Sequence, residues 1–241
     1  MDLPYADQPI REASTVCVLR PGAEGLEVLM VRRAVSSAFV GGAYVFPGGA
    51  VDAADRSDTA RRIFGDGETS PWLSAGVRET AEEAGVVIPA GPGQPAIPRG
   101  VKGSRLLGML DHDGYVFDER RFAYLSNWVT PKGQPRRFDT RFFVTDAPAG
   151  LEAAPDAAEV TEAVWVTPHD ALAYRRERGW TLIDPTVATL KLLGAYEDPG
   201  AVLAFAERQV SVPRIEPRIV MRFGSLRLLM PGDPGYDEAG E

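Results

Sequence analysis

The 241-residue sequence has only one cysteine and two histidines. One cysteine cannot form a disulfide within the chain, and neither His112 nor His169 has a ligand partner at a useful spacing in the sequence. Cys17 lies in the short apolar run 16–19, where nothing nearby would activate a thiol. We therefore expect it to be a small buried residue rather than a nucleophile.

Positive charge and long apolar runs are also scarce. The chain has 26 Lys and Arg against 34 Asp and Glu, a net charge of −8. This balance argues against general binding to nucleic acid or to anionic membranes, both of which need basic patches. No stretch approaches the ~18 apolar residues of a membrane span, and the N-terminus lacks the cationic start and apolar core of a signal peptide. We expect a cytoplasmic protein with no nucleic-acid or membrane partner.

Acidic residues, in contrast, are concentrated at one place. Glu79, Glu82 and Glu83 have the spacing i, i+3 and i+4, which places three carboxylates on one face of a helix. Such like charges repel one another unless a cation lies among them. Mg²⁺ or Mn²⁺ fits this role, because these ions prefer oxygen ligands and bridge carboxylates to phosphates. The alternative is a solvated helix face, which is the usual meaning of a charged run.

The residues around this run define a helix and a turn. Ser70 as N-cap and Pro71 at the first helical position predict where the helix begins, and Gly85 predicts where it ends. Upstream, residues 44–46 have the character of a strand end. Gly48 and the glycine after it then allow a sharp turn that brings a backbone carbonyl close to a ligand.

Residues 78–86 match the second half of the Nudix signature, G-x5-E-x7-R-E-U-x-E-E-x-G-U, where U is a bulky apolar residue. The chain therefore resembles the Nudix hydrolases. The first half of the signature differs, since Asp55 stands in place of Glu and 22 residues rather than seven separate it from Arg78. We interpret the additional residues as an inserted helix near 58–65, and we expect a salt bridge or a loop-closing hydrogen bond at Asp55.

Four further segments resemble the peroxisomal-type acyl-coenzyme A diphosphatase branch of this family, at residues 27–55, 128–131, 137–143 and 229–233. The resemblance implies cleavage of coenzyme A or acyl-coenzyme A to 3′,5′-ADP and (acyl-)phosphopantetheine, with Mg²⁺ or Mn²⁺ as cofactor. The alternative substrates are ADP-ribose, NADH or a nucleoside triphosphate. A different alternative is a ligand sensor that keeps the fold without catalysis. A homodimer is possible in each case.

The fold implied by the resemblance is α/β, an αβα sandwich with a mixed sheet. We expect a Nudix domain over 10–179, with an insertion at 56–70, and an extension over 180–241 that packs on the core. Hydrophobic patterns predict strands at 14–20, 26–33, 106–110, 122–130, 138–145, 160–166, 214–222 and 226–230. They predict further helices at 168–178, 185–196 and 199–210, and a loop over 89–100.

The resemblance also implies roles for individual residues. The metal ligands are expected to be Glu79, Glu83 and the carbonyl of Gly48, with Glu82 as a ligand or as the general base. Arg78 is expected to position a neighbouring carboxylate.

The identity of the general base stays open among Glu82, Glu159 and Glu162, because members of the family place it on different elements. Arginines that match phosphate oxygens bidentately are candidates for substrate binding, and an acidic residue beside one of them suggests a pocket wall or a cross-strand ion pair. These substrate-binding candidates are Arg33, Arg137, Asp139 and Arg141.

Overall fold

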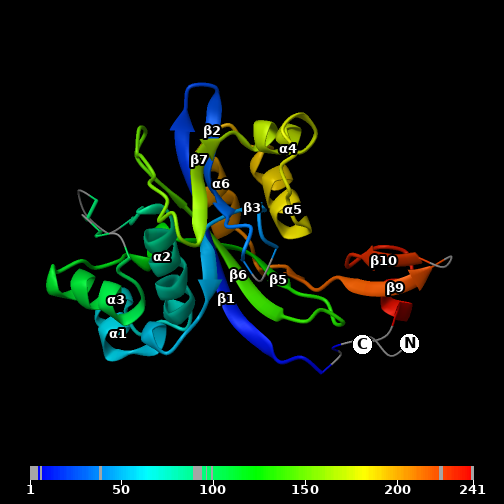
Figure 1. Cartoon of the computed structure of the whole chain (residues 1–241), viewed down its shortest axis with the longest axis horizontal. Coiled ribbons are helices and arrows are strands. Elements are labelled where there is room, and N and C mark those ends of the chain that lie inside the picture. Colours follow the sequence, from blue (N-terminus) through cyan, green and yellow to red (C-terminus); the bar gives the residue numbers. More distant parts are fainter. Residues whose placement is uncertain are drawn as a thin grey trace.

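The computed structural model describes residues 5, 7–37, 40–88, 94, 95, 97, 98, 100–222 and 225–239, so most of the expected loop at 89–100 lies outside the described residues. The described chain is built on an eight-stranded mixed sheet (Figure 1). Its central path has the order β3-β2-β1-β6-β5-β8, while β4 pairs with β1 and β7 pairs with β2. The strands are β1 (Ile10–Gly22), β2 (Gly25–Arg33), β3 (Tyr44–Val45), β4 (Gly48–Ala50), β5 (Ala123–Val129), β6 (Arg137–Asp146), β7 (Val160–Val166) and β8 (Arg214–Ile215).

Helices cover both faces of this sheet, as expected for a sandwich. Alternate residues of β1 pack on opposite sides: Val16 and Val18 join the core cluster beneath the first group of helices, whereas Cys17 and Leu19 join the cluster on the other side. The first group comprises α1 (Asp58–Phe64), α2 (Ser70–Ala84) and α3 (Gly103–His112), and the second comprises α4 (Pro168–Glu177), α5 (Asp184–Leu193) and α6 (Pro199–Glu207). The predicted αβα architecture is confirmed, and Cys17 is buried as expected.

One predicted strand is wrong. Residues 106–110 belong to helix α3. Leu106, Leu107 and Leu110 are all buried, and their spacing of i, i+1 and i+4 places them on one side of a helix, against the core formed with α1 and α2. The short apolar run predicts a buried strand, but its spacing suits a helix.

The two helices around the insertion have defined ends. The inserted helix is confirmed as α1, which begins where the Ser57 side chain accepts a hydrogen bond from Ala60 N and ends at Gly65. For α2 the predicted N-cap is wrong. Thr69 occupies that position, and the Ser70 hydroxyl instead donates to the Phe64 carbonyl. The predicted end is confirmed, because Gly85 adopts the left-handed conformation with φ 65°.

Helix α2 lies directly on strand β1 because residue 76 has no side chain. A Cβ placed on Gly76 would lie 2.7 Å from Val16 Cγ2 and 2.8 Å from Ser14 Oγ, well inside normal contact distance. A larger residue at this position would force these two side chains or the helix to move.

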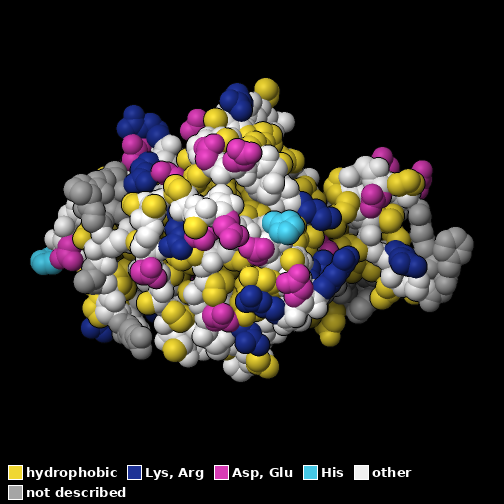
Figure 2. Space-filling model, turned by 90° about the horizontal axis from the view of Figure 1, so that it is seen from above, with side chains coloured by type: hydrophobic (Ala, Val, Ile, Leu, Met, Phe, Trp, Pro, Cys, Tyr) yellow, Lys and Arg dark blue, Asp and Glu magenta, His cyan; other side chains and the backbone are white. Residues whose placement is uncertain are grey.

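The predicted strand 214–222 is divided into two. β8 joins the main sheet, and Pro217, which has no N–H to donate, separates it from β9 (Arg218–Arg222). β9 pairs with β10 (Ser225–Leu229) in a separate hairpin that projects from the body at the right of Figures 1 and 2. Short 3₁₀ turns lie at Ala54–Arg56, Glu119–Arg121 and Asp237–Ala239. None of the described helices is long and apolar enough to span a membrane.

Candidate active site

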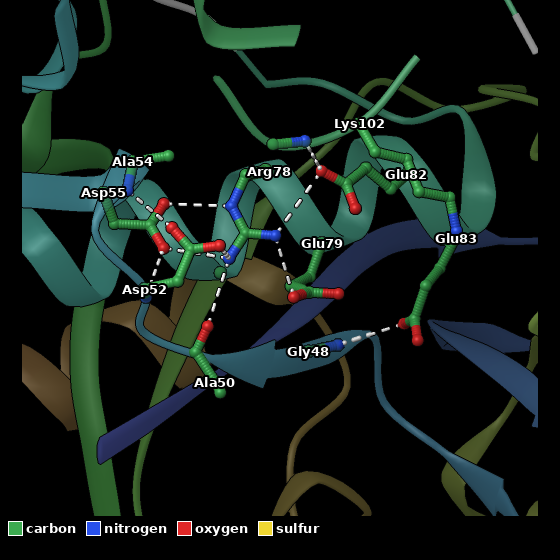
Figure 3. Close-up of polar contacts among 12 residues, drawn as sticks. Gly48, Ala50, Asp52, Ala54, Asp55, Arg78, Glu79, Glu82, Glu83 and Lys102 are labelled. Carbon is green, nitrogen blue, oxygen red and sulfur yellow. Dashed lines mark hydrogen bonds and ion pairs between the residues drawn. The ribbon is translucent and has the colours of Figure 1, made fainter. Parts of the chain in front are cut away.

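Arg78 is the centre of the polar network at α2 (Figure 3). Its guanidinium group donates to both carboxylate oxygens of Asp55, at 3.0 and 2.9 Å, and to the carbonyl of Ala50 at 3.1 Å. On its other side it donates to Glu79 at 2.8 Å and to Glu82 at 3.4 Å. The expected salt bridge at Asp55 is confirmed, and Arg78 joins the turn before the insertion to the acidic face of the helix.

Glu79 and Glu83 lie one turn apart on α2, beside the strand β4. Glu83 Oε2 accepts a hydrogen bond from Gly48 N at 3.2 Å, and Arg33 Nη1 lies 4.0 Å from Glu83 Oε1. A Cβ on Gly49 would lie 2.4 Å from Glu79 Oε1, so this carboxylate occupies the space that the glycine leaves. The two glycines of the turn therefore form one wall of the site.

The pKa values of Glu79 and Glu83 are both raised, which indicates that nearby positive charge does not fully balance the two carboxylates. Burial, followed by the nearby charge of Glu79, raises the pKa of Glu83 to about 8. Burial also raises the pKa of Glu79, while the Arg78 guanidinium opposes the shift. Buried carboxylates with raised pKa values gain strongly from a cation, so their chemistry fits a hard divalent ion.

Glu82 shares the Arg78 Nη1 donor with Glu79, and its carboxylate also contacts the start of α3. Its Oε1 accepts a hydrogen bond from Gly103 N at 2.7 Å, at the start of α3. Among the residues that the structure describes, no group of three His, Cys, Asp or Glu side chains is arranged to hold a metal ion. The described geometry places Glu79 and Glu83 together beside the glycine turn, and the ligand roles of Glu79, Glu82, Glu83 and the Gly48 carbonyl all remain predictions.

Glu159 lies just before β7, within electrostatic range of the pair, since its charge contributes to the raised pKa of both Glu79 and Glu83. Its side chain is 63% exposed and forms an ion pair with Lys102 Nζ at 3.0 Å. Lys102 also contacts Asp156 at 3.1 Å. Asp156 in turn accepts hydrogen bonds from the backbone N–H groups of residues 158–160, which fixes the loop that carries Glu159.

Glu162 is not brought to this site. Its carboxylate accepts a hydrogen bond from the Tyr44 hydroxyl at 2.6 Å. Tyr44 belongs to the core cluster on the opposite face of the sheet from α2 and stacks on Trp180. Burial and this hydrogen bond raise the pKa of Tyr44 to about 12. The contacts of Glu162 are those of a structural residue.

The four substrate-binding candidates lie in different surroundings. Arg33 is beside Glu83, whereas Arg137 is buried and pairs with Glu216 at 2.8 Å. Asp139 accepts a hydrogen bond from Asn127 at 2.5 Å and lies 3.9 Å from Arg214, so the cross-strand ion pair is found there. Arg141 extends toward α2, where its guanidinium group lies 3.6 Å from the centroid of the Trp72 ring.

The sequence did not point to Lys102 or Trp72 as site residues. Lys102 follows the loop at 89–100 and has no motif around it, so nothing in the sequence connects it with Glu159. Trp72 carries a usable signal, because it lies seven residues before Glu79 and therefore on nearly the same helix face.

Comparison with known proteins finds one matching family and several similar proteins. The NUDIX domain family model matches residues 9–188. The crystal structure of a NUDIX hydrolase from Alicyclobacillus acidocaldarius superposes with a TM-score of 0.70 and 32% sequence identity, over 82% of this chain and 96% of that chain. The acyl-coenzyme A diphosphatase NUDT19 of Homo sapiens is 26% identical over 90% of this chain and 74% of its own length. The protein of that name from Gallus gallus is 25% identical over 95% of this chain and 80% of its own length.

Proposed function

The chain belongs to the NUDIX domain family and is a Nudix hydrolase, and we propose that it cleaves the diphosphate linkage of coenzyme A or an acyl-coenzyme A. The products would be 3′,5′-ADP and (acyl-)phosphopantetheine. The observation that carries the proposed chemistry is the pair of carboxylates of Glu83, which is buried, and Glu79, which is partly buried, held against the turn of Gly48 and Gly49. The choice of substrate is supported by the acyl-coenzyme A diphosphatases to which the chain is similar.

Glu79 and Glu83 would hold a divalent cation, Mg²⁺ or Mn²⁺, with the Gly48 carbonyl and Glu82 as further candidates. Such an ion, when bound, neutralises the diphosphate and acidifies a water molecule. The protein's own contribution is orientation. Arg78 fixes Glu79 through the 2.8 Å hydrogen bond, and the absence of a side chain at Gly49 leaves room for that carboxylate.

We assign the general base to Glu159. It is the candidate that combines exposure to water with electrostatic proximity to both Glu79 and Glu83. Glu82 is occupied by its hydrogen bonds to Gly103 and Arg78, and Glu162 lies across the sheet. Lys102 would hold the Glu159 carboxylate in place until it accepts a proton from the attacking water.

One positively charged side chain would assist at the reacting diphosphate. Arg33 reaches the edge of the site beside Glu83, where it would contact phosphate oxygens. Water that attacks phosphorus must approach a centre already surrounded by negative oxygens, so this positive charge near the site favours the reaction.

The proposed domain organisation is a Nudix domain over 10–179, interrupted by the insertion at 56–70, with an extension over 180–241. It is supported by the packing of Leu190, Leu193 and Val202 into the core cluster on the second face of the sheet. The ion pair between Arg137 and Glu216 further ties the extension to β6.

The test is product identification. The protein would be incubated with Mg²⁺ or Mn²⁺ and separately with coenzyme A, an acyl-coenzyme A, ADP-ribose, NADH and a nucleoside triphosphate. Formation of 3′,5′-ADP from the first two supports the proposal. Turnover of ADP-ribose, NADH or the triphosphate alone would transfer the activity to that substrate, and no turnover of any would indicate a ligand sensor.

A further inference from the structure

Arg141 is held in place without a charged partner. Its guanidinium group stacks on the Trp72 ring at 3.6 Å and lies 5.7 Å from the Tyr124 ring centroid. It forms no hydrogen bond or ion pair with any residue that the structure describes. Stacking restricts the orientation of the guanidinium plane but leaves the N–H donors at its edge available. A half-buried arginine in this state is prepared to receive an anion.

The acidic residues near Arg141 are already engaged. Asp139, two residues away on β6, accepts a hydrogen bond from Asn127 and lies 3.9 Å from Arg214. Glu12 on the neighbouring strand pairs with Arg56. Arg56 also approaches the Trp72 ring, at 5.4 Å, so a second guanidinium group lies at this ring, while Glu12 balances its charge and the charge of Arg141 is left over. This small region is therefore basic, within a chain of net charge −8.

The position of Trp72 relates this region to the catalytic carboxylates. Trp72 and Glu79 are seven residues apart on α2, which is almost two full turns, so both face β1 and its neighbours. The rise of the helix separates them by about 10 Å along its axis. An anion bound at Arg141 would thus lie on the same side of α2 as the proposed cleavage site, but at a distance from the scissile diphosphate.

We propose that Arg141, positioned by Trp72 and supported by Arg56, forms a subsite for a second phosphate group of the substrate. This inference rests on the proposed cleavage of a diphosphate beside Glu79. It specifies the substrate class as a nucleoside diphosphate derivative that carries an additional phosphomonoester on its ribose. Coenzyme A has such a group, whereas ADP-ribose and NADH do not, so the subsite would determine specificity between these substrates.

The decisive experiment compares substrates that differ only in that phosphate. KM and kcat would be measured for coenzyme A and for 3′-dephospho-coenzyme A, with the wild-type protein and with Arg141→Met. We expect the substitution to raise KM for coenzyme A about 10- to 100-fold, the usual effect of losing a charge-assisted hydrogen bond. KM for the dephosphorylated substrate should be unchanged, and Arg141→Lys should fall between the two proteins. An equal loss with both substrates, or no loss with either, overturns the subsite.

Arg11→Met is the matched control, because it removes the same charge from an exposed neighbouring position on β1. It should leave both KM values unchanged, and a rise equal to that of Arg141→Met would reduce the effect to overall charge and overturn the proposal.

Calorimetric titration separates the subsite from the proposed reaction, since it requires no turnover. The wild-type protein should bind adenosine 3′,5′-bisphosphate more tightly than AMP, and Arg141→Met should remove that difference. If coenzyme A is not cleaved but this difference is found, the proposed function fails and the subsite stands. If coenzyme A is cleaved and the two ligands bind equally well, the subsite alone is overturned.

Discussion

Arg78 and Asp55 form a buried, two-pronged ion pair between residues 23 positions apart in the sequence, with hydrogen bonds of 3.0 and 2.9 Å. The side chain of Asp55 is 0% exposed and that of Arg78 is 4% exposed. Ser74 donates a further hydrogen bond to Asp55 at 2.9 Å. The pair closes the loop that contains the insertion, so the shorter aspartate still reaches the arginine that orients Glu79.

Arg78→Met should therefore destabilise the fold as well as reduce activity. It leaves the Asp55 carboxylate buried without its cation, which costs about 3–5 kcal/mol. Urea denaturation measures this change. The double variant Arg78→Met, Asp55→Asn removes both charges and should recover part of the loss. A single variant within about 0.5 kcal/mol of the wild type, the range typical of surface positions, would contradict the structural role.

Glu83→Gln should abolish turnover while the fold is retained. The substitution keeps the shape of the side chain but removes a proposed ligand charge, and the expected fall in kcat is more than about 100-fold, beyond that caused by changing a residue that only supports a ligand. Because the folded metal-free protein keeps Glu83 protonated below about pH 8, glutamine replaces a neutral group and the melting temperature should not fall. Near-normal kcat with saturating Mn²⁺ would remove Glu83 from the mechanism.

The stability of the metal-free protein should depend on pH through Glu83. Its folded pKa is about 8 against an ordinary value of 4.5, so between these values the folded state keeps a proton that the unfolded state has released. The free energy of unfolding then falls as pH rises, by at most about 1.4 kcal/mol per pH unit, until the loss is complete above the folded pKa. Denaturation in a chelating buffer from pH 5 to 8.5 tests this. Glu83→Gln should flatten the curve, and an unchanged slope would contradict the assignment.

Glu159→Gln should affect catalysis, whereas Glu162→Gln should affect stability. Loss of the proposed general base should lower kcat about 10²- to 10⁴-fold with little change in melting temperature. Glu162→Gln should leave kcat nearly unchanged and act on stability, because it alters the hydrogen bond with Tyr44. Steady-state kinetics and thermal melts on both variants separate the roles, and the reverse pattern would exchange the assignments. Lys102→Met should lower kcat only while Glu159 is present.

Gly49→Ala should damage the site without unfolding the protein. The new methyl group would meet Glu79 Oε1 at 2.4 Å, and the end of that flexible side chain can move away. The carboxylate would then leave its place beside Gly48, so kcat should fall and the Mn²⁺ concentration for half-maximal activity should rise. Gly108→Ala is the control, since an added Cβ there meets nothing within 4 Å and lies on a helix. Equal effects of the two substitutions would contradict this explanation.

Much of the fold and half of the site could be predicted from local patterns. Strand β7 has the predicted bounds, and the glutamates of α2 follow from their spacing alone. The strand predicted at 106–110 failed because burial on one side of a helix and burial within a sheet both require apolar residues.

The remaining parts of the site depend on tertiary contacts that leave no local trace. Lys102 meets Glu159 only because the start of α3 lies beside β7 in space. Glu162 looked equivalent to Glu159 in the sequence, yet strand alternation and the bulge between Arg32 and Arg33 send it to the Tyr44 side of the sheet. Arg137 is a candidate phosphate ligand in the sequence, but in the structure it forms an ion pair with Glu216, which belongs to the extension.

The contact of Gly76 with Ser14 and Val16 sets the depth at which α2 lies on the sheet. The helix that carries Glu79 and Glu83 is seated by the fold itself, before any ligand arrives. We therefore expect reorganisation on binding to be confined to side chains, among them the two guanidinium groups around Trp72. Differences in activity between substrates should for this reason depend on how well each substrate fits a site whose helix does not move, and not on how far the substrate displaces α2.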